Sequence, residues 1–448
     1  MESIIKINPK IKLVIFIVFI LVTGIIASVR SQSGSNDFDT FYQAGKNVLK
    51  GESAYYTGEY YQENATVSPF LYPPFAAYVF SGLALFPLKI AAFLWNALNI
   101  FLFFITIKII ILILKQGPQK LTETHSSHFF IAICFGAITL LDNLSMAQIN
   151  ILVFFITIFS LFFWLKKYLF ISGILLSIAI LIKVTPAILF FYFVVKKQWR
   201  VILGICFGLL AFTILIPSLF VGIENNRLYH RQFIGRTIKP IVSDFLNQNK
   251  EPHHPLKKTK EMRLRDRLAS RLVEKNQALE AAITRIFLKN RKNYAELPMN
   301  LFLVKKYEKL PVFFPIPRPL LDILIRLVQM AILGGMVLLS IQISRKGTSH
   351  WVPIEFSVWI LSITMLSPLT RSHQFISWLF PLILWAIDSQ YKKMRGFIIF
   401  SFILYLLQGV PYGKAIGFGA WGNLVLWLVF LKISFNELSP ALHKPITA

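Results

Sequence analysis

The sequence predicts an all-α polytopic membrane protein. Of its 448 residues 55% are hydrophobic, and the mean hydropathy is +0.61. Apolar runs of membrane-spanning length recur from residue 13 to residue 432, which no soluble core requires. Short loops rich in lysine and arginine alternate with polar loops that contain glycine and proline, as in a chain that crosses a bilayer repeatedly.

The apolar runs predict about 12 spans, with 11 to 13 as the range, because a bilayer-spanning helix needs about 20 residues. They are residues 13–29, 90–114, 128–141, 149–165, 168–182, 186–195, 201–220, 319–343, 351–367, 375–388, 396–411 and 417–432. The short ranges 168–182 and 186–195 flank a Lys-Val-Thr-Pro sequence, so we expect tilted or broken helices there. The segment 75–88 is expected to be a short interfacial helix, because proline is favoured at a helix start and disfavoured within.

The first run follows a lysine-containing N-terminus and has no convincing small-residue cleavage site after it, so we expect an uncleaved span. Basic short loops mark the cytoplasmic side of a membrane protein. If the spans alternate, that side receives residues 115–120, 166–167, 196–200, 344–347 and 391–395. The outer side then receives the polar or Gly/Pro-marked patches 35–45, 142–150, 183–186, 367–373 and 412–419. We expect the functional site on that outer side.

A basic hydrophilic insert, residues 221–317, interrupts the apolar pattern and contains one segment of helical character. The predicted organisation is an N-terminal transmembrane module (1–220) with a first outer loop (30–89), then the insert, then C-terminal transmembrane helices (318–448). Alternation places the insert outside, but its basicity leaves its side and the exact span count open. Basic residues from Arg263 to Arg271 are expected to bind anionic lipid head groups or to keep an exposed helix soluble, two alternatives that the sequence does not separate.

The charge balance points to membrane lipids rather than nucleic acid as the partner of the basic residues. Lys and Arg number 47 against 21 Asp and Glu, a formal net charge of +26, and in a membrane protein such an excess favours cytoplasmic loops and anionic lipids. Two cysteines, Cys134 and Cys206, each within an apolar run, indicate neither a disulfide framework nor a metal cluster. The adjacent pair His253 and His254 has no further ligands at useful spacing. We expect no metal and no cofactor.

Several motifs occur in order along the chain: an acidic residue before Phe-Tyr-x-Ala-Gly (41–45), then a Gly-x-x-x-Tyr element, Tyr-Pro-Pro (72–74), a Pro-Leu turn and Trp95. Residues 146–150, 173–186 and 367–382 continue the pattern. In this combination the chain resembles glycosyltransferase family 87, whose members depend on polyprenyl-phosphate sugars and are mannosyltransferase-like. The resemblance covers most of the chain outside the insert. Residues 247–249 match only part of the family's Asn-Gln-Ser-like element, so acceptor recognition stays open.

The resemblance implies a GT-C type fold with a catalytic aspartate in the first outer loop. It further implies an inverting transfer of one sugar, mannose or a related pentose or hexose, from a polyprenyl-phosphate donor to a lipid or glycan acceptor. Such an enzyme acts at the outer face of the bacterial cytoplasmic membrane and uses no nucleotide sugar. The sugar, the acceptor, the linkage and the oligomeric state are not readable from the sequence.

Asp37 matches the family's catalytic carboxylate. An acceptor hydroxyl loses its proton as it attacks the anomeric carbon, and a positioned carboxylate acts as general base. The alternative is that Asp37 only caps the helix that contains the Phe-Tyr-x-Ala-Gly motif. Asp39 is the reserve candidate and is otherwise assigned to substrate binding.

A departing polyprenyl phosphate needs positive charge or hydrogen-bond donors. Lys183, Arg371 and His373 are the candidates for binding it. An ionisable residue in an apolar segment is a functional candidate, and the alternative for Lys183 is snorkelling to the interface. His373 matches the family motif better than Arg371 does, and the alternative for a lone interfacial histidine is a structural role.

Gln148 and Asn150 are expected to hydrogen-bond sugar hydroxyls, joined by Asp142, with an ordinary polar helix end as the equal alternative. Aromatic side chains are expected to stack on the sugar or line a lipid groove, although aromatic residues are common at membrane interfaces in any case. They are Tyr42, Tyr72, Trp95 and the aromatic residues from Tyr55 to Tyr61.

Two other classes of function stay open on the sequence alone. A lipid-linked glycan flippase or other transporter would need charges within the spans, for which Lys183, Asp322 and Glu355 are candidates. A noncatalytic assembly scaffold would make Asp37 dispensable for sugar transfer.

Overall fold

The computed structural model describes residues 37–55, 70–115, 126–238, 271–272, 275–289, 314–346, 352–387 and 394–438, with single positions between 18 and 29. Within these ranges the regular elements are helices, and no β-strand occurs among them. The chain forms two compact units, each made of separate stretches of sequence. Unit 1 comprises Met1–Ile109, Ile138–Val184 and Leu203–Lys239, and unit 2 comprises Ile110–Ala137, Thr185–Ile202 and Pro240–Ala448.

Unit 1 contains the helices α2 (Phe38–Leu49), α4 (Pro74–Ser81), α7 (Asn150–Leu165), α8 (Leu169–Ile182), α11 (Ile216–Val221) and α12 (Ile223–Phe233). Unit 2 contains α9 (Ile188–Val195), α15 (Leu279–Phe287), α17 (Arg318–Lys346), α18 (Val352–Leu366), α19 (Leu379–Ile387), α20 (Arg395–Leu407), α21 (Pro411–Ile416) and α22 (Phe418–Leu438). The helices α5 (Leu88–Lys115), α6 (Ser126–Ser145) and α10 (Trp199–Leu210) have residues in both units.

Each expected span from 90–114 to 417–432 coincides with a helix, whereas the first, 13–29, lies largely outside the described residues. Four helical stretches in the described part of the chain are long and apolar enough to cross a membrane. They are Leu88–Lys115, Trp199–Val221, Arg318–Arg345 and Phe418–Phe435. The other apolar helices are shorter, so the number of spans stays a prediction.

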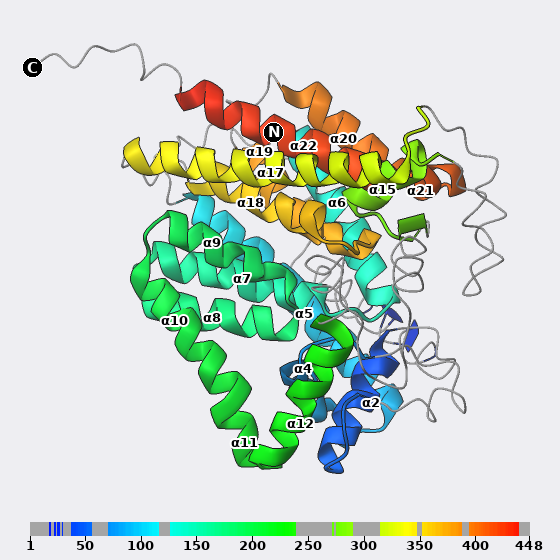
Figure 1. The fold of residues 1–448 in the computed structure, drawn as a ribbon, viewed down its shortest axis with the longest axis vertical. Coiled ribbons are helices and arrows are strands. Elements are labelled where there is room, and N and C mark those ends of the chain that lie inside the picture. Colours follow the sequence, from blue (N-terminus) through cyan, green and yellow to red (C-terminus); the bar gives the residue numbers. More distant parts are fainter. Residues whose placement is uncertain are drawn as a thin grey trace, which may run out of the picture. The chain divides into compact units, whose positions relative to one another are not determined.

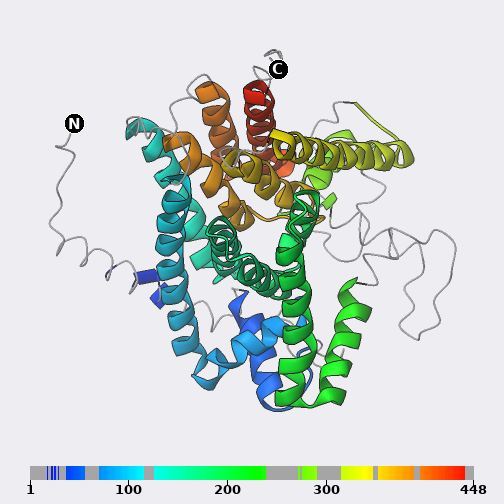
Figure 2. The same cartoon turned by 90° about the vertical axis from the view of Figure 1, so that its left-hand side faces the viewer.

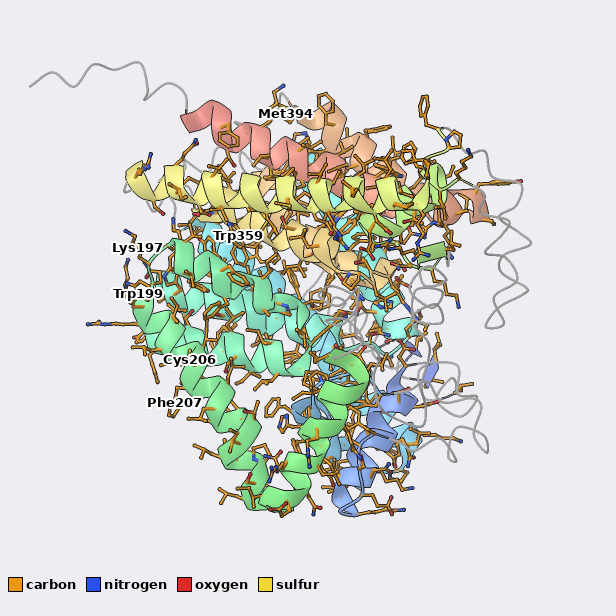
Figure 3. All side chains as sticks on the ribbon, viewed as in Figure 1. Lys197, Trp199, Cys206, Phe207, Trp359 and Met394 are labelled. Atoms are coloured by element: carbon orange, nitrogen blue, oxygen red, sulfur yellow. The ribbon has the colours of Figure 1, made fainter. Side chains whose placement is uncertain are left out.

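The outer side of α10 has the composition of a lipid-facing surface. Trp199, Leu203 and Phe207 recur at helical spacing and are at least half exposed, and exposed apolar residues continue along the helix toward α11. Trp199, Cys206 and Phe207 lie along one side of α10 (Figure 3). An apolar stripe of this length on a soluble protein would be an aggregation liability.

The break expected between 168–182 and 186–195 is present. α8 ends at Ile182, Lys183 has an extended backbone with φ −150° and ψ 125°, and a 3₁₀ turn, η2 (Thr185–Ala187), precedes α9. Pro186 explains the break, because proline has no N–H to donate within a helix. The 75–88 segment differs in detail from the expectation: α4 ends at Ser81 and a 3₁₀ turn follows. Pro87 lies just before the first residue of α5, where its carbonyl accepts from Ala91 (2.9 Å).

Close packing of α2 on α4 positions the start of α2 (Figure 1). Gly45, the glycine of the Phe-Tyr-x-Ala-Gly motif, faces the α4 backbone so closely that an added Cβ would lie 2.7 Å from the Phe80 carbonyl. Phe80 stacks on Phe41 with ring centroids 4.7 Å apart and lies 4.7 Å from the Trp95 ring. The motif's glycine and aromatic residues therefore fix α2 against α4 and α5.

Unit 2 is built around the buried helix α18, which packs against α17 and α22, with α20 beside α22 (Figures 1 and 2). Aromatic stacking joins the start of α6 to this unit, with His128 4.1 Å from the Trp385 ring and Phe135 5.3 Å from the Trp378 ring. Every residue from Leu279 to Ile286 of α15 is buried. The helix α15 of the insert is thus an element of the core of unit 2, whereas α12, at the start of the insert, belongs to unit 1.

Candidate functional site

Five polar residues of unit 1 form one hydrogen-bonded cluster, which we call the amide cluster: Asp37, Asn143, Gln148, Asn150 and Lys183. They come from the start of α2, the end of α6, the turn before α7, the start of α7 and the residue after α8. The sequence predicted four of them as separate candidates, and the structure brings these together. Asn143 was missed, although it lies in the polar 142–150 patch.

The α6–α7 turn is held by donors from three directions. The Trp95 indole N–H donates to the Ala147 carbonyl (3.1 Å), and Asn96 Nδ2 donates to the Leu144 carbonyl (3.2 Å). The Asp37 backbone N–H donates to the Met146 carbonyl (3.1 Å). Ala147 has a φ of 45°, a left-handed conformation that costs an alanine about 1–2 kcal/mol, and such strain persists where the surroundings overdetermine the backbone.

Asp37 stands at the N-cap position of α2, but its side chain makes no capping hydrogen bond. Its Oδ2 instead accepts a hydrogen bond from Gln148 Nε2. The alternative role as a simple helix cap therefore does not describe this carboxylate. Asp39 is buried in the first turn of α2, and its assignment to substrate binding stays a prediction.

The amide cluster has a defined direction from donor to acceptor. Lysine has donors only, so Lys183 Nζ selects the oxygen of the Asn150 amide, Oδ1, at 2.6 Å. Asn150 Nδ2 then donates to Asn143 Oδ1 (3.2 Å) and to Gln148 Oε1 (3.5 Å), which leaves Gln148 Nε2 for Asp37. Asn143 is oriented independently, because its Nδ2 donates to the Thr139 carbonyl (2.8 Å).

Burial differs between the ends and the middle of the cluster. Asn143, Gln148 and Asn150 are 1%, 2% and 5% exposed, whereas Asp37 and Lys183 are half-buried. Both N–H groups of the Asn150 amide are engaged within the cluster. The geometry thus favours orientation of the charged ends, rather than contact with sugar hydroxyls, as the role of the buried amides.

The aromatic candidates are part of the packing around this cluster. Trp95 is 1% exposed and its N–H is bonded to the turn, so a role in stacking on sugar is not supported. Tyr42 donates its hydroxyl to the Phe86 carbonyl (2.9 Å), and the ring of Tyr72 lies 4.8 Å from that of Phe41. Asp142 accepts from Ser145 through its backbone carbonyl (2.9 Å). Residues 56–61 lie outside the described residues.

Arg371 and His373 belong to unit 2, where Arg371 immediately precedes the 3₁₀ helix η7 (Ser372–Trp378) and His373 is its second residue. Arg371 has an extended backbone with φ −116° and ψ 162° and is half-buried, while His373 is 4% exposed. A proline-containing loop, 367–371, leads into them from α18 and carries the Ser-Pro-Leu-Thr-Arg motif. Their role in phosphate binding stays a prediction.

Asp322 and Glu355, two of the three charges considered for a translocation path, are paired inside unit 2, whereas Lys183 belongs to the amide cluster of unit 1. Glu355 is fully buried and bonds Lys196 at 3.0 Å, and Tyr192 donates to the same carboxylate oxygen (3.4 Å). Asp322 accepts from Arg271 Nη1 (2.5 Å). Glu355 is buried in its ion pair, whereas the side chain of Asp322 is 32% exposed. Ion pairs within unit 2 account for both carboxylates, so these two residues give the transporter alternative no support.

Two further expectations concern the insert. Of the basic residues from Arg263 to Arg271, only Arg271 is among the described residues. It is 6% exposed and pairs with Glu280 (3.3 Å) as well as with Asp322, so neither lipid binding nor solubilisation describes Arg271. Residues 247–249, His253 and His254 lie outside the described residues. No group of three or more His, Cys, Asp or Glu side chains in the described ranges is arranged to hold a metal ion.

Apolar helices of spanning length and a buried polar cluster at helix ends define an integral membrane protein with a polar site. The sequence model of glycosyltransferase family 87 matches residues 70–256, which confirms the resemblance to that family over this range. The match includes Tyr72, Gln148, Asn150 and Lys183 but begins after Asp37, Asp39 and Tyr42 and ends before Arg371 and His373.

Two curated relatives carry the name polyprenol-phosphate-mannose-dependent alpha-(1-2)-phosphatidylinositol pentamannoside mannosyltransferase. The protein from Mycolicibacterium smegmatis is 27% identical over 221 residues, covering 48% of this chain and 51% of the relative. The protein from Mycobacterium tuberculosis is 28% identical over 189 residues, covering 40% of each chain. The chain therefore spans about half the length of the curated relatives it matches. No solved structure matches it.

Proposed function

We propose that this protein is a glycosyltransferase that moves a single mannose from a polyprenyl-phosphate donor to a lipid or glycan acceptor. The family match and the names of both relatives support the reaction class and the donor. We further propose a GT-C type fold of about 12 spanning helices in the bacterial cytoplasmic membrane, with the active site on the outer face. Acceptor and linkage are not part of the proposal.

The orientation of the Asp37 carboxylate is the observation that carries the catalytic assignment. Asp37 is the only member of the amide cluster that bears negative charge, and Gln148 holds one of its oxygens. In an inverting displacement the acceptor oxygen bonds to the anomeric carbon as the bond from that carbon to the phosphate oxygen breaks. The hydroxyl proton passes to Asp37, and polyprenyl phosphate leaves with the electron pair.

The leaving phosphate gains negative charge as the bond breaks, and cationic donors stabilise that charge. We assign this role to Arg371 and His373. Lys183 donates a hydrogen bond to Asn150. We therefore assign Lys183 as the positively charged end of the amide cluster. Contact between Lys183 and the phosphate stays a prediction.

The test is transfer of radiolabelled mannose from polyprenyl-phosphate-mannose into a membrane lipid extract by purified wild type and Asp37→Asn. The substitution keeps the shape and removes the base, so we expect a loss of about 10²- to 10⁴-fold with donor binding retained. Glu224→Gln is the matched control, because it neutralises the exposed carboxylate in the first turn of α12. Equal rates in wild type and Asp37→Asn would refute the assignment of the base. Absence of transfer from any polyprenyl-phosphate sugar would contradict the enzyme proposal.

A further inference from the structure

The described residues of the insert include the stretch 275–289, which we call the insert segment and which is buried from Asn276 to Ile286. It contains charged and polar residues, yet Glu280, Thr284 and Arg285 of its helix are 3%, 1% and 1% exposed. Burying such groups is costly unless each is hydrogen-bonded. The hydrogen-bond partners of these buried residues therefore identify the parts of the chain that the insert segment holds in place.

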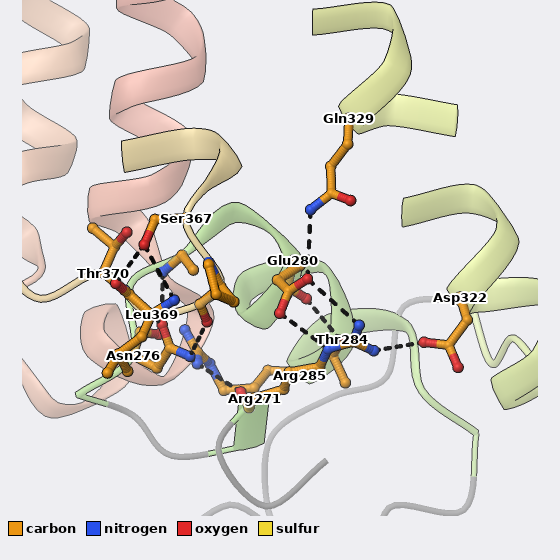
Figure 4. Close-up of polar contacts among 12 residues, drawn as sticks. Arg271, Asn276, Glu280, Thr284, Arg285, Asp322, Gln329, Ser367, Leu369 and Thr370 are labelled. Carbon is orange, nitrogen blue, oxygen red and sulfur yellow. Dashed lines mark hydrogen bonds and ion pairs between the residues drawn. The ribbon is translucent and has the colours of Figure 1, made fainter. Parts of the chain in front are cut away.

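Asn276 binds the loop that leads to Arg371 (Figure 4). Its Nδ2 donates to the Pro368 carbonyl (3.1 Å), and its Oδ1 accepts from the Thr370 backbone N–H (3.2 Å). The next residue, Gln277, donates its backbone N–H to the Thr370 carbonyl (2.5 Å). One side-chain amide and one peptide N–H thus fix the backbone of residues 368–370, directly before Arg371.

Arg285 fixes the backbone that carries Asn276 through hydrogen bonds to three backbone carbonyls. Its Nη1 donates to the Asn276 carbonyl (2.7 Å) and to the Arg271 carbonyl (3.0 Å), and its Nε donates to the Ala415 carbonyl (2.7 Å). Gln277 Nε2 donates to the Lys414 carbonyl (2.9 Å). The insert segment is therefore attached to α21 as well as to the 367–371 loop.

The α15 helix is also closely fitted to its neighbours. Gly417, which ends α21 with φ 84°, leaves no room for a side chain, because an added Cβ would lie 2.5 Å from Ala282 Cβ. On the other side, Arg271 joins Glu280 to Asp322 of α17, and Gln329 Nε2 lies 3.5 Å from Glu280 Oε2 (Figure 4). Packing and ion pairs both hold the insert segment in one position.

Other hydrogen bonds of the loop run to the end of α18 or within the loop. Thr370 Oγ1 donates to the Thr364 carbonyl of α18 (2.8 Å), and Ser367 Oγ bonds within the loop to the Leu369 carbonyl (2.7 Å). These bonds are local to the end of α18. Asn276 and Gln277, by contrast, reach the loop from a distant part of the sequence.

We propose that Asn276 is a positioning residue, which sets the backbone that presents Arg371 and His373. The insert then acts within unit 2, by ordering the residues assigned to the donor phosphate. The catalytic part of this inference rests on the proposed function, since Arg371 and His373 are assigned there to the donor phosphate. The structural part, the ordering of 367–371 by Asn276, is independent of it.

The test uses the full-length protein with Asn276→Ala and Asn276→Asp. Asn276→Ala removes both side-chain bonds to the loop, whereas Asn276→Asp keeps an acceptor for the Thr370 and Ala278 N–H groups and loses the donor to Pro368. Asn225→Ala is the control, because that amide bonds the Val221 carbonyl of a nearby turn (3.0 Å) on an exposed surface.

Hydrogen exchange of a peptide spanning 366–374 measures the ordering of the loop independently of enzyme activity. We expect about 5- to 150-fold faster exchange in Asn276→Ala, the range for losing two hydrogen bonds, a smaller increase in Asn276→Asp, and none in Asn225→Ala. Unchanged exchange in both Asn276 variants would overturn the positioning role. If Asn276→Ala does not fold, the same comparison is made with Asn276→Asp alone.

Kinetics then separate the two proposals. We expect Asn276→Ala to lower kcat for transfer from polyprenyl-phosphate-mannose by roughly 10-fold, with a smaller change in KM, as in Arg371→Ala, because the assigned role is to stabilise charge that develops in the transition state. If Arg371→Ala and His373→Ala leave kcat unchanged while exchange at 366–374 rises in Asn276→Ala, the phosphate assignment fails and the ordering of the loop stands. Raised exchange with wild-type kcat in Asn276→Ala alone would overturn its role in positioning Arg371 and His373.

Discussion

Gln148→Leu is the sharpest test of the amide cluster. The change removes the N–H group that holds Asp37 and keeps a side chain of similar size. Gln148 is 2% exposed, so water does not replace the lost donor freely. A hydrogen bond to a charged group contributes about 1.5–3 kcal/mol, which corresponds to about 10- to 150-fold in rate if the bond is needed in the transition state.

Initial rates of mannose transfer at saturating and limiting donor give kcat and kcat/KM separately. We expect kcat to fall by that factor with little change in donor KM, because Gln148 acts on the base. Asn150→Asp is a second variant: it places an acceptor beside Gln148 Oε1, so Gln148 must turn its amide and present oxygen to Asp37. A loss of kcat at least as large as in Gln148→Leu is expected.

Asn99→Leu is the matched control, since Asn99 is 1% exposed and its Nδ2 donates to the Trp95 carbonyl of its own helix (2.9 Å). It removes a buried amide of unit 1 that is no member of the cluster. Wild-type kcat in Gln148→Leu, together with inactivity of Asp37→Asn, would show that Asp37 works without this support and refute the reasoning. A loss in Asn99→Leu equal to that in Gln148→Leu would point to general damage instead.

Three further outcomes concern stability. Lys196→Met leaves Glu355 buried without its ion pair and is expected to lower the free energy of unfolding by about 3–5 kcal/mol. Thermal unfolding in detergent should show a lower Tm, and the double variant Lys196→Met with Glu355→Gln should recover part of the loss. Burial lowers the pKa of His230 below its ordinary 6.5, although a bond to a backbone carbonyl opposes the shift. Because the unfolded chain then binds the proton more readily, the contribution of neutral His230 to the free energy of unfolding is fully present above pH 6.5 and is lost as the pH falls through the pKa of the folded state. His230→Gln should flatten that decline, and an unchanged pH profile of the variant would contradict this prediction. Gly45→Ala puts a Cβ 2.7 Å from a backbone carbonyl and is expected to cost about 1–3 kcal/mol, whereas Gly82→Ala, with its nearest atom at 4.0 Å, should leave Tm unchanged.

The helices were predictable because uninterrupted apolar runs define them. The break after α8 was equally readable, since proline follows Lys183 closely. The limits of α4 were less so, because Pro87 suits either the inside of a poor helix or the start of the next one, and only packing decides between them.

The polar cluster was predictable in four of its five members and not in its connections. Asp37, Gln148, Asn150 and Lys183 were singled out because polar residues at the ends of apolar segments are uncommon. Each was expected to contact substrate, and the sequence contains no signal that Asn150 uses its donors on Asn143 and Gln148. Such hydrogen bonds depend on the distances between helices that lie far apart in the sequence.

The buried position of α15 was the least predictable feature. Its charges are typical of a solvated helix, and only partners elsewhere in the chain change that interpretation. Arg285 is bonded to backbone carbonyls, which every residue possesses. A sequence pattern therefore cannot identify the partner of such an arginine.

The position of α15 in the chain has a consequence for biogenesis. It packs against α17, α18, α21 and α22, all of which are synthesised after it. During translation its glutamate and arginine side chains cannot be buried until the helices that cover them, the last of which lie more than a hundred residues further along the chain, have been synthesised. Folding of unit 2 is thus completed by its last helices, and a ribosome stalled before α21 would hold a chain whose insert segment has nowhere to dock.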